Sequence, residues 1–176
     1  MSSVILPEIL WTISLAALLL SAATDLKERI IPNELVAAIA LSGLLLCLAM
    51  RPGQVCLSLL AAGLIFLALG ILCRYGAIAG GDVKLMSAVT LLVPPDGVGE
   101  LLVWIALAGG FLSSLYLGAS YMIAGAGAGD AVPRGAASDA TWASRESARV
   151  ASRKQVPYAI AIFGGVIWYV ATESFP

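Results

Sequence analysis

Long apolar stretches, separated by short polar segments, run through most of the chain. A transmembrane helix needs about 20 largely apolar residues. We expect such helices near the following residues: 4–24, 34–50, 55–73, 83–93, 100–123 and 156–172. The first stretch has no basic segment before it and is followed by further spans, so we expect it to be retained and not removed as a signal peptide. The pattern predicts an all-α polytopic membrane protein of about six transmembrane helices, forming one domain over residues 1–176 with a cytoplasmic loop at 125–155.

The fourth stretch is shorter than the others. Residues 83–93 would form about 16 Å of helix, whereas the hydrocarbon core of a bilayer is about 30 Å thick. Pro94 and Pro95 follow, and prolines break or kink a helix. Either the helix continues past this kink, or it starts at Asp82 below the membrane surface. In the second case residues 76–81 would be irregular backbone at membrane depth, which is tolerated where it is buried in protein or lines a wet cavity.

Basic residues predict the orientation, because loops that carry Lys and Arg stay in the cytoplasm. With six spans and the N-terminus outside, all 10 basic residues except Arg51 fall on the cytoplasmic side. This topology puts Asp25, at the end of the first span, and Asp82, at the start of the fourth, on the cytoplasmic face. The two carboxylates can meet if these helices pack together.

The composition limits the chemistry that the chain can perform. It is 60% hydrophobic and 12% charged, whereas soluble proteins carry about 25% charged residues. Histidine is absent, which excludes Ser-His triads and histidine metal sites. Cys47, Cys56 and Cys73 lie in apolar stretches without CxxC spacing, so we expect no disulfide framework, no zinc site and no cofactor. The 10 basic and 11 acidic residues balance, and nothing in the charge indicates nucleic-acid binding.

Two aspartates beside apolar spans are the most informative polar residues, because a carboxylate near a bilayer is costly. Asp25 lies where the first helix should end, and a negative charge there opposes the helix dipole. Such a misfit is typical of a functional site; a solvated loop position near Lys27 and Arg29 is the alternative. For Asp82 the alternative is a helix N-cap. Two carboxylates that share one proton are the minimal equipment of an aspartic protease.

Other polar residues have simpler interpretations. We expect Pro32 to end the first loop and Asn33 to cap the second helix. Lys84 either neutralises the acidic pair, binds lipid phosphates, or extends to the membrane interface as lysines do. Arginines recur every four residues at 145, 149 and 153, which is consistent with an interfacial helix on anionic lipid and equally with a disordered cytoplasmic loop.

Three segments of the chain resemble the type IV prepilin peptidases, which are membrane aspartic proteases of the GxGD type. The first segment contains Asp25, Arg29 and Ile31-Pro32-Asn33, the second is Gly80-Gly81-Asp82-Val83-Lys84-Leu85, and the third is Val156-Pro157-Tyr158-Ala159-Ile160-Ala161. The chain is most similar to the short, peptidase-only members of Flp-type (tight adherence) pilus systems. Two departures stand out: Ala79 replaces the first Gly of GxGD, and Ala159 stands where the third motif has Gly.

The resemblance implies that Asp25 and Asp82 are the catalytic pair. The other residues that it marks as supporting the site are Arg29, Pro32, Asn33, Gly80, Gly81, Lys84 and Pro157. It implies cleavage of prepilin or pseudopilin leader peptides at the cytoplasmic face of the bacterial inner membrane, with the lipid bilayer and the pilus assembly machinery as further partners. Bifunctional relatives carry an N-terminal methyltransferase region and a cysteine-rich zinc loop; this chain begins at its first span, so we do not expect it to methylate pilins.

Two other functions remain as alternatives. A non-proteolytic membrane protein could use the acidic pair as a proton or cation relay. A relay should line a path through the bilayer, whereas both carboxylates are expected at one face. A structural subunit that has lost catalysis is disfavoured because both aspartates are present.

Overall fold

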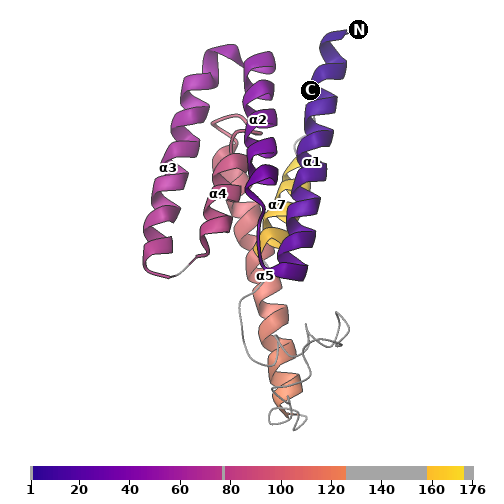
Figure 1. Ribbon diagram of the computed structural model, residues 1–176, viewed down its shortest axis with the longest axis vertical. Coiled ribbons are helices and arrows are strands. Elements are labelled where there is room, and N and C mark those ends of the chain that lie inside the picture. Colours follow the sequence, from indigo (N-terminus) through magenta and orange to yellow (C-terminus); the bar gives the residue numbers. More distant parts are fainter. Residues whose placement is uncertain (1, 77, 126–157, 173–176) are drawn as a thin grey trace. The chain divides into compact units, whose positions relative to one another are not determined.

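The computed structural model describes residues 2–76, 78–125 and 158–172, and every long regular element in these ranges is an α-helix (Figure 1). In chain order these elements are α1 (Ser2–Glu28), α2 (Asn33–Met50), the 3₁₀ turn η1 (Pro52–Gln54), α3 (Val55–Arg74), α4 (Gly80–Val89), α5 (Val98–Gly125) and α7 (Tyr158–Thr172). The predicted all-α fold is confirmed. Except for Gly125 the expected loop at 125–155 lies outside the described residues, and so does Pro157.

The chain divides into two compact units, Met1–Ala108 with Pro157–Pro176, and Gly109–Val156. The first unit contains α1 to α4, the beginning of α5, and α7. Both aspartates singled out by the sequence belong to it. The single domain expected from the sequence stays a prediction.

Four helices are long and apolar enough to cross a membrane: Ile5–Glu28, Asn33–Met50, Pro52–Arg74 and Val98–Ala119. The polytopic membrane character predicted from the sequence is therefore confirmed. The count of six is not, because α7 is a shorter apolar helix and α4 has only 10 residues.

Helix α4 ends well before the two prolines that were expected to limit it. Its last residue is Val89, and Thr90, Leu91 and Leu92 follow in a turn closed by backbone hydrogen bonds of 3.0–3.2 Å. A helix that continues past Pro94 was one of the two expectations, and it is wrong. The turn is buried, and the Arg51 Nη2 donates to the Leu92 carbonyl at 3.1 Å. This bond satisfies an acceptor that the helix itself leaves open.

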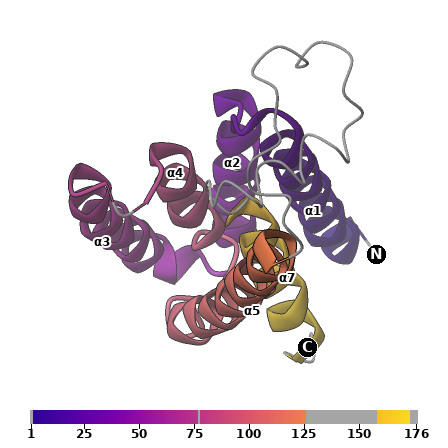
Figure 2. The same cartoon turned by 90° about the horizontal axis from the view of Figure 1, so that it is seen from below.

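The short helix α4 lies between α2 and α3, with α7 also against it, and α1 packs on α2 and α7 (Figures 1 and 2). Its apolar side chains Leu85 and Val89 are fully buried. On α2, a Cβ added to Gly43 would lie 2.9 Å from the Leu91 Cβ, so glycine permits the close approach of α2 to the turn after α4. Packing on three sides holds α4 in place although it is too short to span a membrane.

Candidate active site

Asp25 lies in the last turn of α1, four residues beyond a buried Ser21 on the same face. It is 8% exposed, so the solvated loop position considered from the sequence is wrong. The helix ends just after it: the Arg29 N–H donates to the Asp25 carbonyl at 3.0 Å, and Arg29 has a φ of 58°. A left-handed residue at this position commonly terminates a helix. The Arg29 guanidinium also interacts electrostatically with the Asp25 carboxylate.

The Asp25 carboxylate is held by a helix from the far end of the sequence. The backbone N–H of Ala159, in the first turn of α7, donates to Asp25 Oδ2 at 3.1 Å. Ala159 is completely buried. The sequence indicated this segment only through the family resemblance. A backbone N–H donor cannot be recognised from residue types, because every residue except proline has one.

Asp82 is the third residue of α4 and is also 8% exposed. The N-cap position belongs to Ala79, without a side-chain hydrogen bond, so the N-cap interpretation of Asp82 is wrong. Ala79 has a φ of −74° and a ψ of 144°, an extended conformation open to any residue. Alanine at the first position of the GxGD pattern therefore fits this backbone without the conformational freedom of glycine.

The two carboxylates are close enough to affect each other. Asp82 lies outside the four helices that can span a membrane. Burial, and then the negative charge of Asp25, raise the pKa of Asp82 from its ordinary value of 3.8 to about 6. Two carboxylates that are both desolvated and mutually repelling share a proton more readily than they ionise together. Residues 25 and 82, far apart in sequence, therefore form an electrostatically coupled pair.

Gly81 and Gly80 differ in what surrounds them. A Cβ on Gly81 would lie 3.3 Å from Ile31 Cδ1, which is tighter than most Cβ contacts, and 3.4 Å from Ile31 Cβ. A Cβ on Gly80 would meet only the Cys73 Sγ, at 3.8 Å. Gly81 thus permits the loop after Asp25 to pack against the start of α4, whereas Gly80 has room for a methyl group.

A polar contact joins the same two segments at the surface. Lys84 Nζ on α4 donates to Asn33 Oδ1 at 3.1 Å. Pro32, and not Asn33, occupies the N-cap position of α2, and no side chain caps this helix. The expectation that Asn33 caps α2 is wrong, since its side chain accepts from Lys84 instead. Of the supporting residues marked in the sequence, only Pro157 is not placed.

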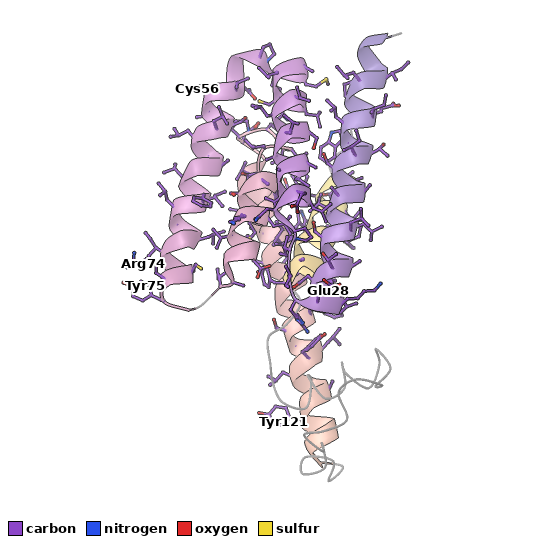
Figure 3. The ribbon with its side chains drawn as sticks, viewed as in Figure 1. Glu28, Cys56, Arg74, Tyr75 and Tyr121 are labelled. Atoms are coloured by element: carbon purple, nitrogen blue, oxygen red, sulfur yellow. The ribbon has the colours of Figure 1, made fainter. Side chains whose placement is uncertain are left out.

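The ends of the helices that carry these residues gather at one end of the first unit. Figure 3 shows Glu28, at the end of α1, and Arg74 and Tyr75, at the end of α3, at the same end, with Cys56 at the other end of α3. Within the described parts of the chain, no group of three or more Cys, Asp or Glu side chains is arranged to hold a metal ion. The buried acidic side chains at this end are those of Asp25 and Asp82.

Comparison with known protein families gives a match. The model of the type IV leader peptidase family matches residues 12–123, a range that includes Asp25 and Asp82. No curated protein and no solved structure matches the chain. The family match confirms the resemblance drawn from the three sequence segments. Because it extends over more than half of its length, the chain belongs to the type IV leader peptidase family and is a membrane-embedded peptidase.

Proposed function

We propose that the chain is an aspartic endopeptidase that removes the leader peptides of Flp-like type IV prepilins or pseudopilins. The observation that carries the proposal is the pairing of Asp25 and Asp82, two buried carboxylates on different helices that interact electrostatically. A pair that holds one proton between two carboxylates can act as base and acid in one step. The family match supports a leader peptidase in general, and the dyad supplies a mechanism for it.

The proposed reaction needs one proton on the pair. The ionised aspartate takes a proton from water while the water oxygen bonds to the scissile carbonyl carbon. The protonated aspartate gives its proton to the carbonyl oxygen, and a tetrahedral diol results. When the C–N bond breaks, the first aspartate gives its proton to the leaving nitrogen, and a diol hydroxyl returns a proton to the second. Both carboxyl groups end as they began, and no covalent intermediate forms.

The proposed site of cleavage is the cytoplasmic face of the bacterial inner membrane. Two observations support this placement. The basic residues predict that Asp25 and Asp82 lie on the cytoplasmic side, and the C-terminal ends of α1 and α3 lie at the same end of the first unit (Figure 3). A prepilin would dock its hydrophobic helix laterally against the spans. Its polar leader would stay in the cytoplasm and present the junction at the interface.

The relay function has no comparable support. A proton path across a bilayer needs ionisable groups at several depths. Among the described residues of the four spanning helices, the acidic side chains lie within the first or last few residues of each helix: Glu8, Asp25, Glu28, Glu34 and Glu100. The middle of each of these helices is free of acidic residues. We therefore favour the peptidase.

Cleavage of a purified substrate tests the proposal. The full chain would be reconstituted in liposomes with a prepilin encoded in the same genome, and the products would be mapped by mass spectrometry. We expect a single cut between the charged leader and the hydrophobic helix. A soluble peptide with the same junction but without the hydrophobic helix is the matched control, and it should be cleaved much more slowly. Cleavage at many unrelated sites, or none by folded protein, would refute the proposed function.

A further inference from the structure

The two proposed catalytic carboxylates have different hydrogen-bond surroundings. Asp25 Oδ2 accepts the Ala159 N–H at 3.1 Å. Within the ranges that the structure describes, no hydrogen bond reaches the Asp82 side chain. Ala159 is the second residue of α7, and the first four N–H groups of a helix have no acceptor inside it. The Ala159 N–H therefore has no acceptor within α7, and Asp25 supplies one.

This contact favours the ionised form of Asp25. An N–H forms a stronger, charge-assisted hydrogen bond with a carboxylate than with a neutral carboxyl group. The N-terminal end of α7 adds a partial positive charge, and the Arg29 guanidinium attracts the same carboxylate. Burial disfavours ionisation of both aspartates, since each side chain is 8% exposed, so the hydrogen bond is what distinguishes them. Asp82 also lies in the first turn of a helix, but there the dipole acts without a hydrogen bond. Burial and the charge of Asp25 raise the pKa of Asp82 to about 6.

The remaining charged groups around the pair do not reverse this order. At the ends of the elements that meet here, the other titratable groups are Lys27 and Glu28 in the last turn of α1, Arg29 directly after it, Glu34 on α2, Cys73, Arg74 and Tyr75 at the end of α3, Lys84 on α4 and Tyr158 on α7. The side chains at 27, 28, 34, 74 and 84 are exposed, where water and salt screen their charges. Tyr158 interacts with Asp82 and is neutral near pH 7, because an ordinary tyrosine titrates near pH 10.

We infer that Asp25 is the base that takes the proton from water, that Asp82 carries the shared proton, and that the Ala159 N–H fixes this division as a positioning group. The inference rests on the proposed function, and it assigns roles that the sequence leaves open. In the first step, the water proton moves to Asp25 as the C–O bond forms. The proton of Asp82 moves to the carbonyl oxygen. In the second step, Asp25 protonates the leaving nitrogen and Asp82 regains its proton from the diol.

Removal of the single N–H tests this division. Proline has no N–H and is tolerated in the first turn of a helix, so Ala159→Pro deletes the donor to Asp25. Ile160→Pro deletes the next N–H of the same turn, and Ala159→Gly keeps the donor, so both serve as controls. The readout is the rate of prepilin cleavage by the full chain in liposomes as a function of pH. A base must be ionised and an acid protonated, so the acidic limb reports the base and the basic limb reports the acid.

We expect Ala159→Pro to move the midpoint of the acidic limb upward by about one pH unit, and the two controls to leave it in place. Movement of the basic limb instead would make Asp25 the acid and overturn the assignment. An unchanged profile in an Ala159→Pro protein that still cleaves would show that the N–H does not divide the roles, and would overturn it too.

A second measurement needs neither the variant nor a substrate. Aspartate labelled with carbon-13 at the side-chain carboxyl would be incorporated into the wild-type chain, and its carboxyl signals would be titrated in detergent micelles. Asp25→Asn and Asp82→Asn spectra assign the two signals. We expect the Asp25 carboxyl to ionise at lower pH than that of Asp82; the reverse order overturns the inference. Because this titration is independent of cleavage, a chain that fails to cut prepilin would refute the proposed function without deciding the order of ionisation.

Discussion

Lys84 Nζ donates a hydrogen bond to Asn33 Oδ1 over 3.1 Å. Asn33 begins α2, directly after the loop that follows Asp25, and Lys84 is two residues beyond Asp82 on α4. The bond therefore joins the two segments that carry the proposed catalytic pair. Beneath it, Ile31 packs against the position where Gly81 lacks a side chain. One polar and one apolar contact thus hold the segment after α1 against the start of α4.

Loss of the polar contact should slow cleavage without abolishing it. A hydrogen bond of this kind contributes about 0.5–1.5 kcal/mol, which corresponds to about 2- to 10-fold. We expect Lys84→Met and Asn33→Ala each to lower the rate by that factor, and the double variant to lose no more than the worse single variant. Lys27→Met, which removes another exposed lysine near the site, is the control. Additive losses in the double variant would show that the two side chains act separately.

A methyl group at Gly81 should be more harmful than one at Gly80. The added Cβ would lie 3.3 Å from Ile31 Cδ1 at Gly81 and 3.8 Å from the Cys73 Sγ at Gly80. Overpacking destabilises a folded protein by about 1–3 kcal/mol, so we expect Gly81→Ala to lower the melting temperature and to slow cleavage by displacing Asp82, and Gly80→Ala to change both little. Ile31→Val removes the terminal methyl that meets the new Cβ and should restore part of the loss. Equal effects of the two alanines would contradict the packing described here.

The raised pKa of Asp82 makes stability depend on pH in a defined direction. Unfolded, this carboxyl titrates near its ordinary value of 3.8, and folded near 6. Between these values the folded state binds more protons, so the free energy of unfolding falls as pH rises through this window. Asp82→Asn removes the titration. We expect this variant to melt at a higher temperature than wild type at pH 7, and the difference to disappear at about pH 4. A wild type that gains stability relative to the variant as pH rises from 4 to 6 would contradict the burial of Asp82.

The long helices could be predicted from the sequence, because an apolar stretch of sufficient length has few alternatives to a membrane span. The short fourth helix was anticipated in part: the prolines at 94 and 95 indicated an interruption, but the helix ends at Val89. The reason is a tertiary contact, since Arg51, from a distant part of the sequence, and a buried turn satisfy the backbone beyond the helix. Such a contact depends on tertiary packing and leaves no periodic signal.

The candidate site, too, could be predicted only in part. Asp25 and Asp82 stood out because carboxylates are rare beside apolar spans, and their neighbours were found through the family motifs. Asn33 was assigned a capping role that its residue type favours, but the nearby Lys84 offers its side chain a different bond. The Ala159 N–H could not be predicted as a ligand of Asp25, because every residue except proline has such a group. Which backbone donor meets a side chain depends on how the helices pack.

The most direct test of the proposed dyad is the initial rate of prepilin cleavage by Asp25→Asn, Asp82→Asn and Asp96→Asn in liposomes. Asp96 is an exposed aspartate in the turn before α5, so it controls for the substitution itself. We predict that the variants at 25 and 82 each lose more than about a hundredfold in rate while they remain folded and inserted, and that the variant at 96 retains the wild-type rate. A folded variant at either 25 or 82 that cleaves as fast as wild type would contradict the assignment of that residue to catalysis.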